Sequence, residues 1–286
     1  AVKTVFFGVT AAVSAWALRR WGVFHERPAL EEERPASRRA TFVSLLVPLG
    51  VAVLLVFPRL DAYPWPAPDE TFHLTMARNL AVYGQYASGR PETGFVPFDP
   101  YASVGPTVLV PVALAFKVFG VSLVTARVVM ALHFLALCVV VFLFLRKRFG
   151  DMAAGAGVLL LTGSFGSVYL ARSLYGEVPA LLYALTALLC WRQALQGPKA
   201  GFWGILTGVA FACALLSKLF FAIAVMPLFA VLLFDRFHVH RVRWRHLVFP
   251  GASFVIVYGA WMAVQTVFAA PEAGGAAESA AMHMHY

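Results

Sequence analysis

The chain has 286 residues, of which 60% are hydrophobic and only 13% are charged, and its formal net charge is +9. A soluble domain carries about 25% charged residues, so this composition excludes an ordinary soluble globular protein. The basic residues cluster at the ends of long apolar runs, where membrane topology places them, and this argues against a nucleic-acid-binding protein.

Apolar runs of membrane-spanning length recur along the chain. A helix needs about 20 apolar residues to cross a bilayer, and there every backbone polar group must find its partner within the helix. We therefore predict an all-α fold, a polytopic transmembrane helix bundle of about eight spans. The predicted spans are residues 1–18, 41–58, 124–145, 153–171, 178–195, 201–217, 219–234 and 247–268.

These runs divide the chain into three parts. An N-terminal membrane segment with a charged cytoplasmic linker covers residues 1–40, and the main membrane domain covers 41–268. Residues 269–286 are expected to form an outer loop or tail. Because the first residue is not Met and the chain stops soon after an apolar run, we expect it to be a fragment of a longer protein.

Basic connectors predict the orientation of the bundle, because clusters of Lys and Arg favour the cytoplasmic side. The connector 61–120 lacks such a cluster and is therefore expected outside. An odd number of spans must separate it from the next basic cluster, and 124–145 supplies one. The apolar run 105–119 reaches only about 22 Å, short of a core of about 30 Å, so we interpret it as an interfacial helix. The basic clusters lie at 19–40, 146–148, 192–199 and 236–245.

An acidic pair, Asp69 and Glu70, opens the long outer connector in the stretch "PAPDETFHL". Two acids here suit a helix start, where they complement the helix dipole, but an outer carboxylate can also take a proton from an acceptor group. His73 lies one turn after Asp69 on the same helical face. It either orients that carboxylate or simply faces water, and the second interpretation is favoured.

Two later outer turns add further charged residues. The turn "ARSLYGEVPA" contains Arg172 and Glu177, and the turn "LLSKLFF" contains Lys218. Glu177 can be an ordinary loop acid ahead of a proline, and Lys218 can either snorkel to the interface or bind phosphate. Arg172 and Arg127 can bind lipid headgroups or phosphate, although interfacial anchoring is the favoured interpretation.

The stretches "PDETFHLTMARNLAVYGQYA" and "FDPYASVGPTVLVPVALAFKVFGVSLVTARVVMAL" together resemble the first outer loop of the GT-C glycosyltransferases. The closest branch is that of the protein O-mannosyltransferases and lipid A aminoarabinose transferases. The matching residues are Asp69–Glu70, Phe119–Gly120 and Ala126–Arg127. The resemblance implies a multi-span bundle that takes a sugar from a polyprenyl-phosphate carrier near the outer leaflet. The sugar passes to a protein, lipid or glycan acceptor.

The resemblance also implies roles for particular residues. Asp69 is the candidate general base or acceptor-positioning carboxylate, Glu177 matches a second acidic position, and Glu70 is a third candidate catalytic residue. Lys218 matches an element that contacts the carrier phosphate. The candidate residues for binding substrate are Lys218, Arg172 and His73.

A divalent metal cation is a further cofactor that the resemblance suggests. Asp99, in "FDP", falls near an acidic position that is associated with a metal in some members. His283 or His285, in "MHMHY", could complete that site, although two His separated by one residue also occur by chance.

Three functions remain open at this stage. The first is a membrane glycosyltransferase, and the second is a non-catalytic membrane subunit of a larger complex that keeps the same fold. The third is a transporter or flippase of lipid-linked sugars, which is disfavoured because nearly all acids lie at span ends and not at mid-membrane depth. We expect an integral protein of a bacterial or archaeal plasma membrane, with its active face outside the cytoplasm.

Overall fold

The computed structural model of the chain describes residues 38–92, 94–97, 104–222 and 243–268. The predicted span 1–18 and most of 219–234 lie outside these residues. Within them, four helices are long and apolar enough to cross a membrane. These four are α2 (Arg38–Val56), α5 (Leu123–Gly163), α7 (Glu177–Gln196) and α10 (Trp244–Phe268). The helical, polytopic fold class predicted from the sequence is confirmed.

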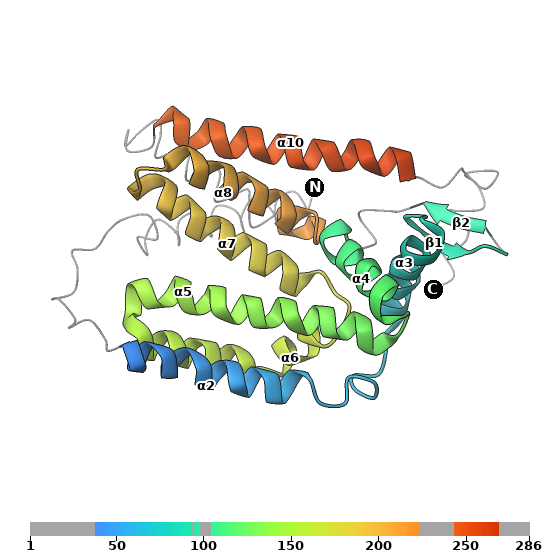
Figure 1. Cartoon of the computed structure of the whole chain (residues 1–286), viewed down its shortest axis with the longest axis horizontal. Helices are drawn as coiled ribbons and strands as arrows, with labels where there is room; N and C mark the ends of the chain where they lie inside the picture. Colours follow the sequence, from blue (N-terminus) through green and yellow to red (C-terminus); the bar gives the residue numbers. More distant parts are fainter. Residues whose placement is uncertain (1–37, 93, 98–103, 223–242, 269–286) are drawn as a thin grey trace, which may run out of the picture.

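The helix α5 is two helical arms joined by a sharp bend (Figure 1). Gly150 at the bend has φ 79° and ψ 172°, a conformation that glycine adopts readily. The second arm returns beside the first and beside α2: a Cβ at Gly157 would lie 2.5 Å from Leu145 Cδ1, and one at Gly155 would lie 2.6 Å from Ser44 O. The predicted spans 124–145 and 153–171 thus correspond to the two arms.

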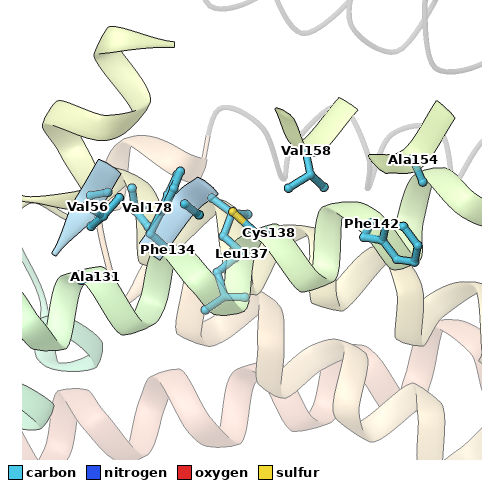
Figure 2. Packing of buried hydrophobic residues seen from close by; sticks show 12 residues of the cluster. Val56, Ala131, Phe134, Leu137, Cys138, Phe142, Ala154, Val158 and Val178 are labelled. Atoms are coloured by element: carbon cyan, nitrogen blue, oxygen red, sulfur yellow. The ribbon is translucent and has the colours of Figure 1, made fainter. Parts of the chain in front are cut away.

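One predicted span is interrupted near its end. At Ser164 the backbone is extended, and the short helix α6 (Phe165–Ala171) follows as a separate element. The core of this half of the molecule lies where both arms of α5 meet α2 and α7 (Figure 2). Its buried side chains include Phe134, Phe142 and Val158.

A second packed region joins α8 (Ala200–Leu215) to α10 through small residues. A Cβ at Gly208 would lie 2.0 Å from Pro250 O and 2.1 Å from Ser253 Oγ, so only glycine permits this approach. The Ser253 hydroxyl donates to Ile205 O at 3.0 Å, which links the two helices by a hydrogen bond. Close backbone approach over small residues is typical of helix pairs in membranes. We call this contact the α8–α10 seam.

The connector between α2 and α5 forms its own compact unit at one end of the bundle (Figure 1). It contains α3 (Pro68–Tyr83), an antiparallel hairpin of β1 (Ala87–Arg90) and β2 (Gly94–Pro97), and α4 (Pro106–Phe119). The hairpin was not predicted from the sequence. Asn79 on α3 fixes β1, because its amide donates to Ala87 O at 3.0 Å and to Gly89 O at 3.1 Å.

Ends of several helices gather next to this connector unit. The last residues of α2, the first residues of α5 and α7, and the last residues of α8 all lie toward α3 and α4 (Figure 1). This agrees with the crossing order predicted from the basic connectors. Side chains that are far apart in the sequence are therefore brought together there.

Candidate functional site

Glu70 and Arg127 form a buried ion pair at the junction of α3 and α5. Their side chains are 1% and 0% exposed. Arg127 Nε donates to Glu70 Oε1 at 3.0 Å, and Nη2 donates to Oε2 at 2.8 Å. The guanidinium also donates to the carbonyl oxygens of Leu60 at 2.8 Å and Pro64 at 2.7 Å. A charge this deeply buried is tolerated because every strong partner is supplied by the protein.

Arg172 binds the start of the same connector, where the chain leaves α2. Its guanidinium is buried and donates to the carbonyl oxygens of Leu55 at 3.0 Å, Pro58 at 2.6 Å, Arg59 at 2.9 Å and Tyr63 at 2.8 Å. These carbonyls belong to the last turn of α2 and the turn that follows it, where backbone groups have no helical partner. Arg172 therefore fixes the path of the chain from α2 toward α3.

Leu174 connects this scaffold to the polar residues of the site. Its backbone N–H donates to Glu70 Oε1 at 3.1 Å, and its carbonyl oxygen lies 2.8 Å from His73 Nδ1. A carbonyl can only accept, so His73 Nδ1 carries the proton and Nε2 of the neutral ring is left as an acceptor. Two side chains of α3 thus hold one backbone residue between α6 and α7.

Glu177 and Lys218 form an ion pair between the start of α7 and the segment after α8. Their side chains are partly exposed, but Glu177 Oε2 is buried and has no hydrogen-bond partner among the described residues. The backbones are in close contact here, because a Cβ at Gly176 would lie 2.5 Å from Ser217 O. Gly105 N also donates to Ser217 O, at 3.1 Å.

His73 shows how closely the charged groups converge. Burial lowers the pKa of His73, while the carboxylates of Asp69 and Glu177 raise the pKa and the ammonium of Lys218 lowers it. The ring lies on α3 one turn after Asp69, and its partner Leu174 lies three residues before Glu177, which pairs with Lys218. Since His73 is only 4% exposed, this convergence takes place at the edge of the protein interior.

Asp69 is the exposed member of the group. It occupies the first turn of α3, which begins at Pro68, and it makes no ion pair with any residue that the structure describes. Its neighbour Glu70 is instead buried, in the ion pair with Arg127. Of these two adjacent carboxylates, Asp69 is therefore the one that a ligand can reach from solvent.

The predicted site residues thus separate into two sets. Asp69 and His73 lie one turn apart on α3, and Glu177 and Lys218 pair three residues beyond Leu174, the partner of His73, whereas Glu70 and Arg172 serve the interior. The sequence predicts a catalytic role for Glu70 and a substrate-binding role for Arg172. The geometry does not fit these two roles, because the charged atoms of both side chains already bond to protein groups.

The predicted metal site cannot be placed, because Asp99, His283 and His285 lie outside the described residues. Within the described parts of the chain, no group of three or more His, Cys, Asp or Glu side chains is arranged to hold a metal ion.

Interfacial anchoring, the role that the sequence favours for Arg127, does not agree with its position in the structure. The side chain is completely buried and binds Glu70 and two carbonyls. A signal was available: the arginine follows "SLVTA" and so lies within the first turns of a long apolar helix, where a buried charge requires a buried partner.

The chain matches one known protein family. Residues 103–262 match the family described as dolichyl-phosphate-mannose-protein mannosyltransferase. No curated protein sequence matches the chain.

Two solved structures share the fold. The crystal structure of ArnT from Cupriavidus metallidurans bound to undecaprenyl phosphate matches with a TM-score of 0.59 and 20% identity, over 78% of this chain and 41% of that chain. The crystal structure of the same protein in the apo state matches with a TM-score of 0.58 and 20% identity, over 81% and 43%. The chain therefore spans less than half the length of ArnT.

Proposed function

The chain belongs to the dolichyl-phosphate-mannose-protein mannosyltransferase family, and from this premise we propose that it is a membrane glycosyltransferase that uses a polyprenyl-phosphate-linked sugar. The chain is an integral membrane protein with the GT-C fold. The observation that supports the proposal most strongly is the Glu177–Lys218 ion pair, which lies three residues after Leu174, the backbone partner of His73 on α3. Separate acids beside a cation suit transfer of a sugar from a phosphate to a hydroxyl.

In the proposed reaction, the bond between the sugar's anomeric carbon and the phosphate oxygen breaks, and its electron pair leaves with the phosphate. The acceptor oxygen forms a new bond to the anomeric carbon and releases its proton. Asp69 takes that proton, because it is the exposed carboxylate of the group and has no partner among the described residues.

Lys218 is proposed to receive the carrier phosphate. Its ammonium pairs with Glu177 in the structure. A phosphate that binds there would replace Glu177 as the partner of the ammonium, and the ammonium would stabilise the negative charge of the leaving phosphate. Glu177 would keep a second oxygen, Oε2, that is not committed to any described group. The structure of ArnT with undecaprenyl phosphate supports a polyprenyl phosphate as the carrier of this fold.

We assign Glu70, Arg127 and Arg172 to positioning. The buried ion pair and the carbonyl contacts of Arg172 fix the connector that presents Asp69. The acceptor is a protein, lipid or glycan hydroxyl, and the site faces away from the cytoplasm of a bacterial or archaeal plasma membrane. A divalent metal at Asp99 with His283 or His285 remains a prediction, and the reaction above does not depend on it.

A transfer assay tests this proposal. The purified chain in lipid vesicles is given undecaprenyl-phosphate mannose and a hydroxyl acceptor peptide, and the rates of wild type, Asp69→Asn and Asp61→Asn are compared. Loss of the general base is expected to lower the rate about 10²- to 10⁴-fold in Asp69→Asn. Asp61, an exposed acid of the same connector, is the matched control and should leave the rate unchanged.

Two results would count against the proposal. A wild-type rate in Asp69→Asn would remove the catalytic assignment. No transfer by the wild type, with donor binding intact, would instead favour a non-catalytic membrane subunit that keeps the fold.

A further inference from the structure

Tyr175 lies between the charged residues and a row of aromatic rings. Its ring centroid is 6.3 Å from that of His73, with the planes at 87°, and 6.2 Å from that of Tyr169, with the planes at 30°. Phe165 continues the row at 6.3 Å from Tyr169. Tyr169 and Tyr175 are half-buried, so each side chain leaves part of its surface open. We call these two residues the tyrosine shelf.

The backbone on both sides of Tyr175 is held in place. Leu174 before it is fixed by Glu70 and His73, through its N–H and its carbonyl oxygen respectively. Gly176 after it is in close contact with the backbone at Ser217. Tyr175 is thus presented by a rigid segment, and a ring that is already ordered loses little conformational freedom when a ligand binds to it.

The hydroxyl of Tyr175 remains a proton donor. Burial raises its pKa first, and the hydrogen bond with the Tyr169 side chain and the negative charges of Asp69 and Glu70 raise it further. The shelf therefore combines an apolar ring face with neutral hydroxyls, and its Tyr175 ring lies 6.3 Å from the ring of His73, one helical turn after the exposed Asp69.

Lys218 lies close to the backbone beside Tyr175. A Cβ at Gly176, the residue next to Tyr175, would lie 3.0 Å from Lys218 Cβ. In a polyprenyl-phosphate sugar, the sugar is joined directly to the phosphate. A phosphate held by Lys218 would consequently place its sugar close to Tyr175.

We propose that the tyrosine shelf binds the sugar ring of the lipid-linked donor, with an apolar face of the ring against Tyr175 and its hydroxyls toward Asp69. This inference rests on the proposed function. A sugar ring has an apolar C–H face and a polar rim, which suits an amphipathic aromatic side chain beside a carboxylate. Tyrosines also anchor membrane proteins at the interface, but anchoring requires neither the fixed backbone nor the neighbouring acid.

Binding of two carriers separates these roles. The whole chain in detergent micelles is titrated with undecaprenyl-phosphate mannose and, separately, with undecaprenyl phosphate, which has no sugar. Tyr175→Ala is expected to weaken binding of the mannosylated carrier about 5- to 10-fold, as for loss of an aromatic contact, and to leave binding of undecaprenyl phosphate unchanged. Tyr175→Phe keeps the ring and should remain within about twofold of wild type for both carriers.

Further variants keep the test decisive. Tyr175→Leu fills the space without an aromatic face and should reproduce the selective loss even if the alanine variant unfolds. Tyr83→Ala removes an exposed tyrosine that packs against Phe95 outside the shelf, and should affect neither carrier. An equal loss for both carriers would show that the shelf contacts the isoprenoid or the phosphate, and no loss would show mere anchoring; either result overturns the inference. If wild type binds neither carrier, the proposed function fails instead.

Discussion

The buried ion pair of Glu70 and Arg127 and the α8–α10 seam join helices in opposite ways. The ion pair places two full charges in the interior and surrounds them with donors and acceptors. The seam contains no charge at its closest point, where Gly208 touches the backbone of Pro250 and the hydroxyl of Ser253. The ion pair depends on its charged side-chain atoms, whereas the seam depends on the lack of a side chain at Gly208.

The two contacts differ in how precisely they position the residues around them. Hydrogen-bonded charges have few acceptable geometries, so the ion pair fixes the start of α3 and therefore the position of Asp69. The seam sets only the distance between α8 and α10, and its small residues carry no charged group. We expect the ion pair to be sensitive to the loss of atoms and the seam to be sensitive to their gain.

The largest effect is expected for Arg127→Met. This change leaves the carboxylate of Glu70 buried without its partner and removes the donors of two carbonyls, which should lower the free energy of unfolding by about 3–5 kcal/mol. Thermal and denaturant unfolding in detergent micelles would measure it.

The double variant Glu70→Gln/Arg127→Met is the control for charge. Because it removes both buried charges together, its free energy of unfolding should fall by clearly less than the summed decreases of the single variants Glu70→Gln and Arg127→Met. Additive losses would mean that the two side chains do not depend on each other, and the contrast with the seam would disappear.

The seam should respond to added volume. Gly208→Leu forces a side chain into the backbone of Pro250, and overpacking of this kind costs about 1–3 kcal/mol, measured by the same unfolding experiments. Gly251→Leu adds the same atoms on α10 at a position where a Cβ would meet nothing within 4 Å, so it should be nearly neutral. Equal losses in the two variants would contradict the close approach of α8 and α10.

The smallest effect is expected when the seam loses an atom. Ser253→Ala removes the hydroxyl that donates to Ile205 O, and hydrogen bonds between membrane helices contribute only about 0.6 kcal/mol on average. Replicate denaturant unfolding of the two proteins side by side in the same micelles would measure so small a change. A loss as large as that of Arg127→Met would show that the seam, too, depends on a polar contact.

Much of the fold could be predicted because apolar runs report burial in lipid directly. The spans at 41–58, 178–195 and 247–268 coincide closely with α2, α7 and α10. The break at Ser164 was missed, since one extended residue inside an apolar run leaves no trace in composition. The hairpin was missed because its strands are four residues long and contain glycine and proline, which are weak strand formers.

The site was harder to predict because its contacts are long-range. The sequence indicated Asp69, Glu177 and Lys218 as polar residues in outer turns, but nothing in the sequence shows that Glu177 pairs with Lys218. Asp69 and Glu70 are adjacent and chemically similar, and only the bond of Glu70 to Arg127 on α5 shows which of them is buried. Tyr175 gave no signal, because a tyrosine in an outer turn is ordinary at a membrane surface.

Charges from three elements are proposed to meet around His73, and the pKa of His73 measures their effect directly. An NMR titration of the imidazole in micelles should give a pKa below the ordinary value of 6.5, because burial disfavours the charged ring. Asp69→Asn and Glu177→Gln should each lower the pKa further, since each removes a negative charge, and Lys218→Met should raise it. A His73 pKa that is the same in all four proteins would contradict the account.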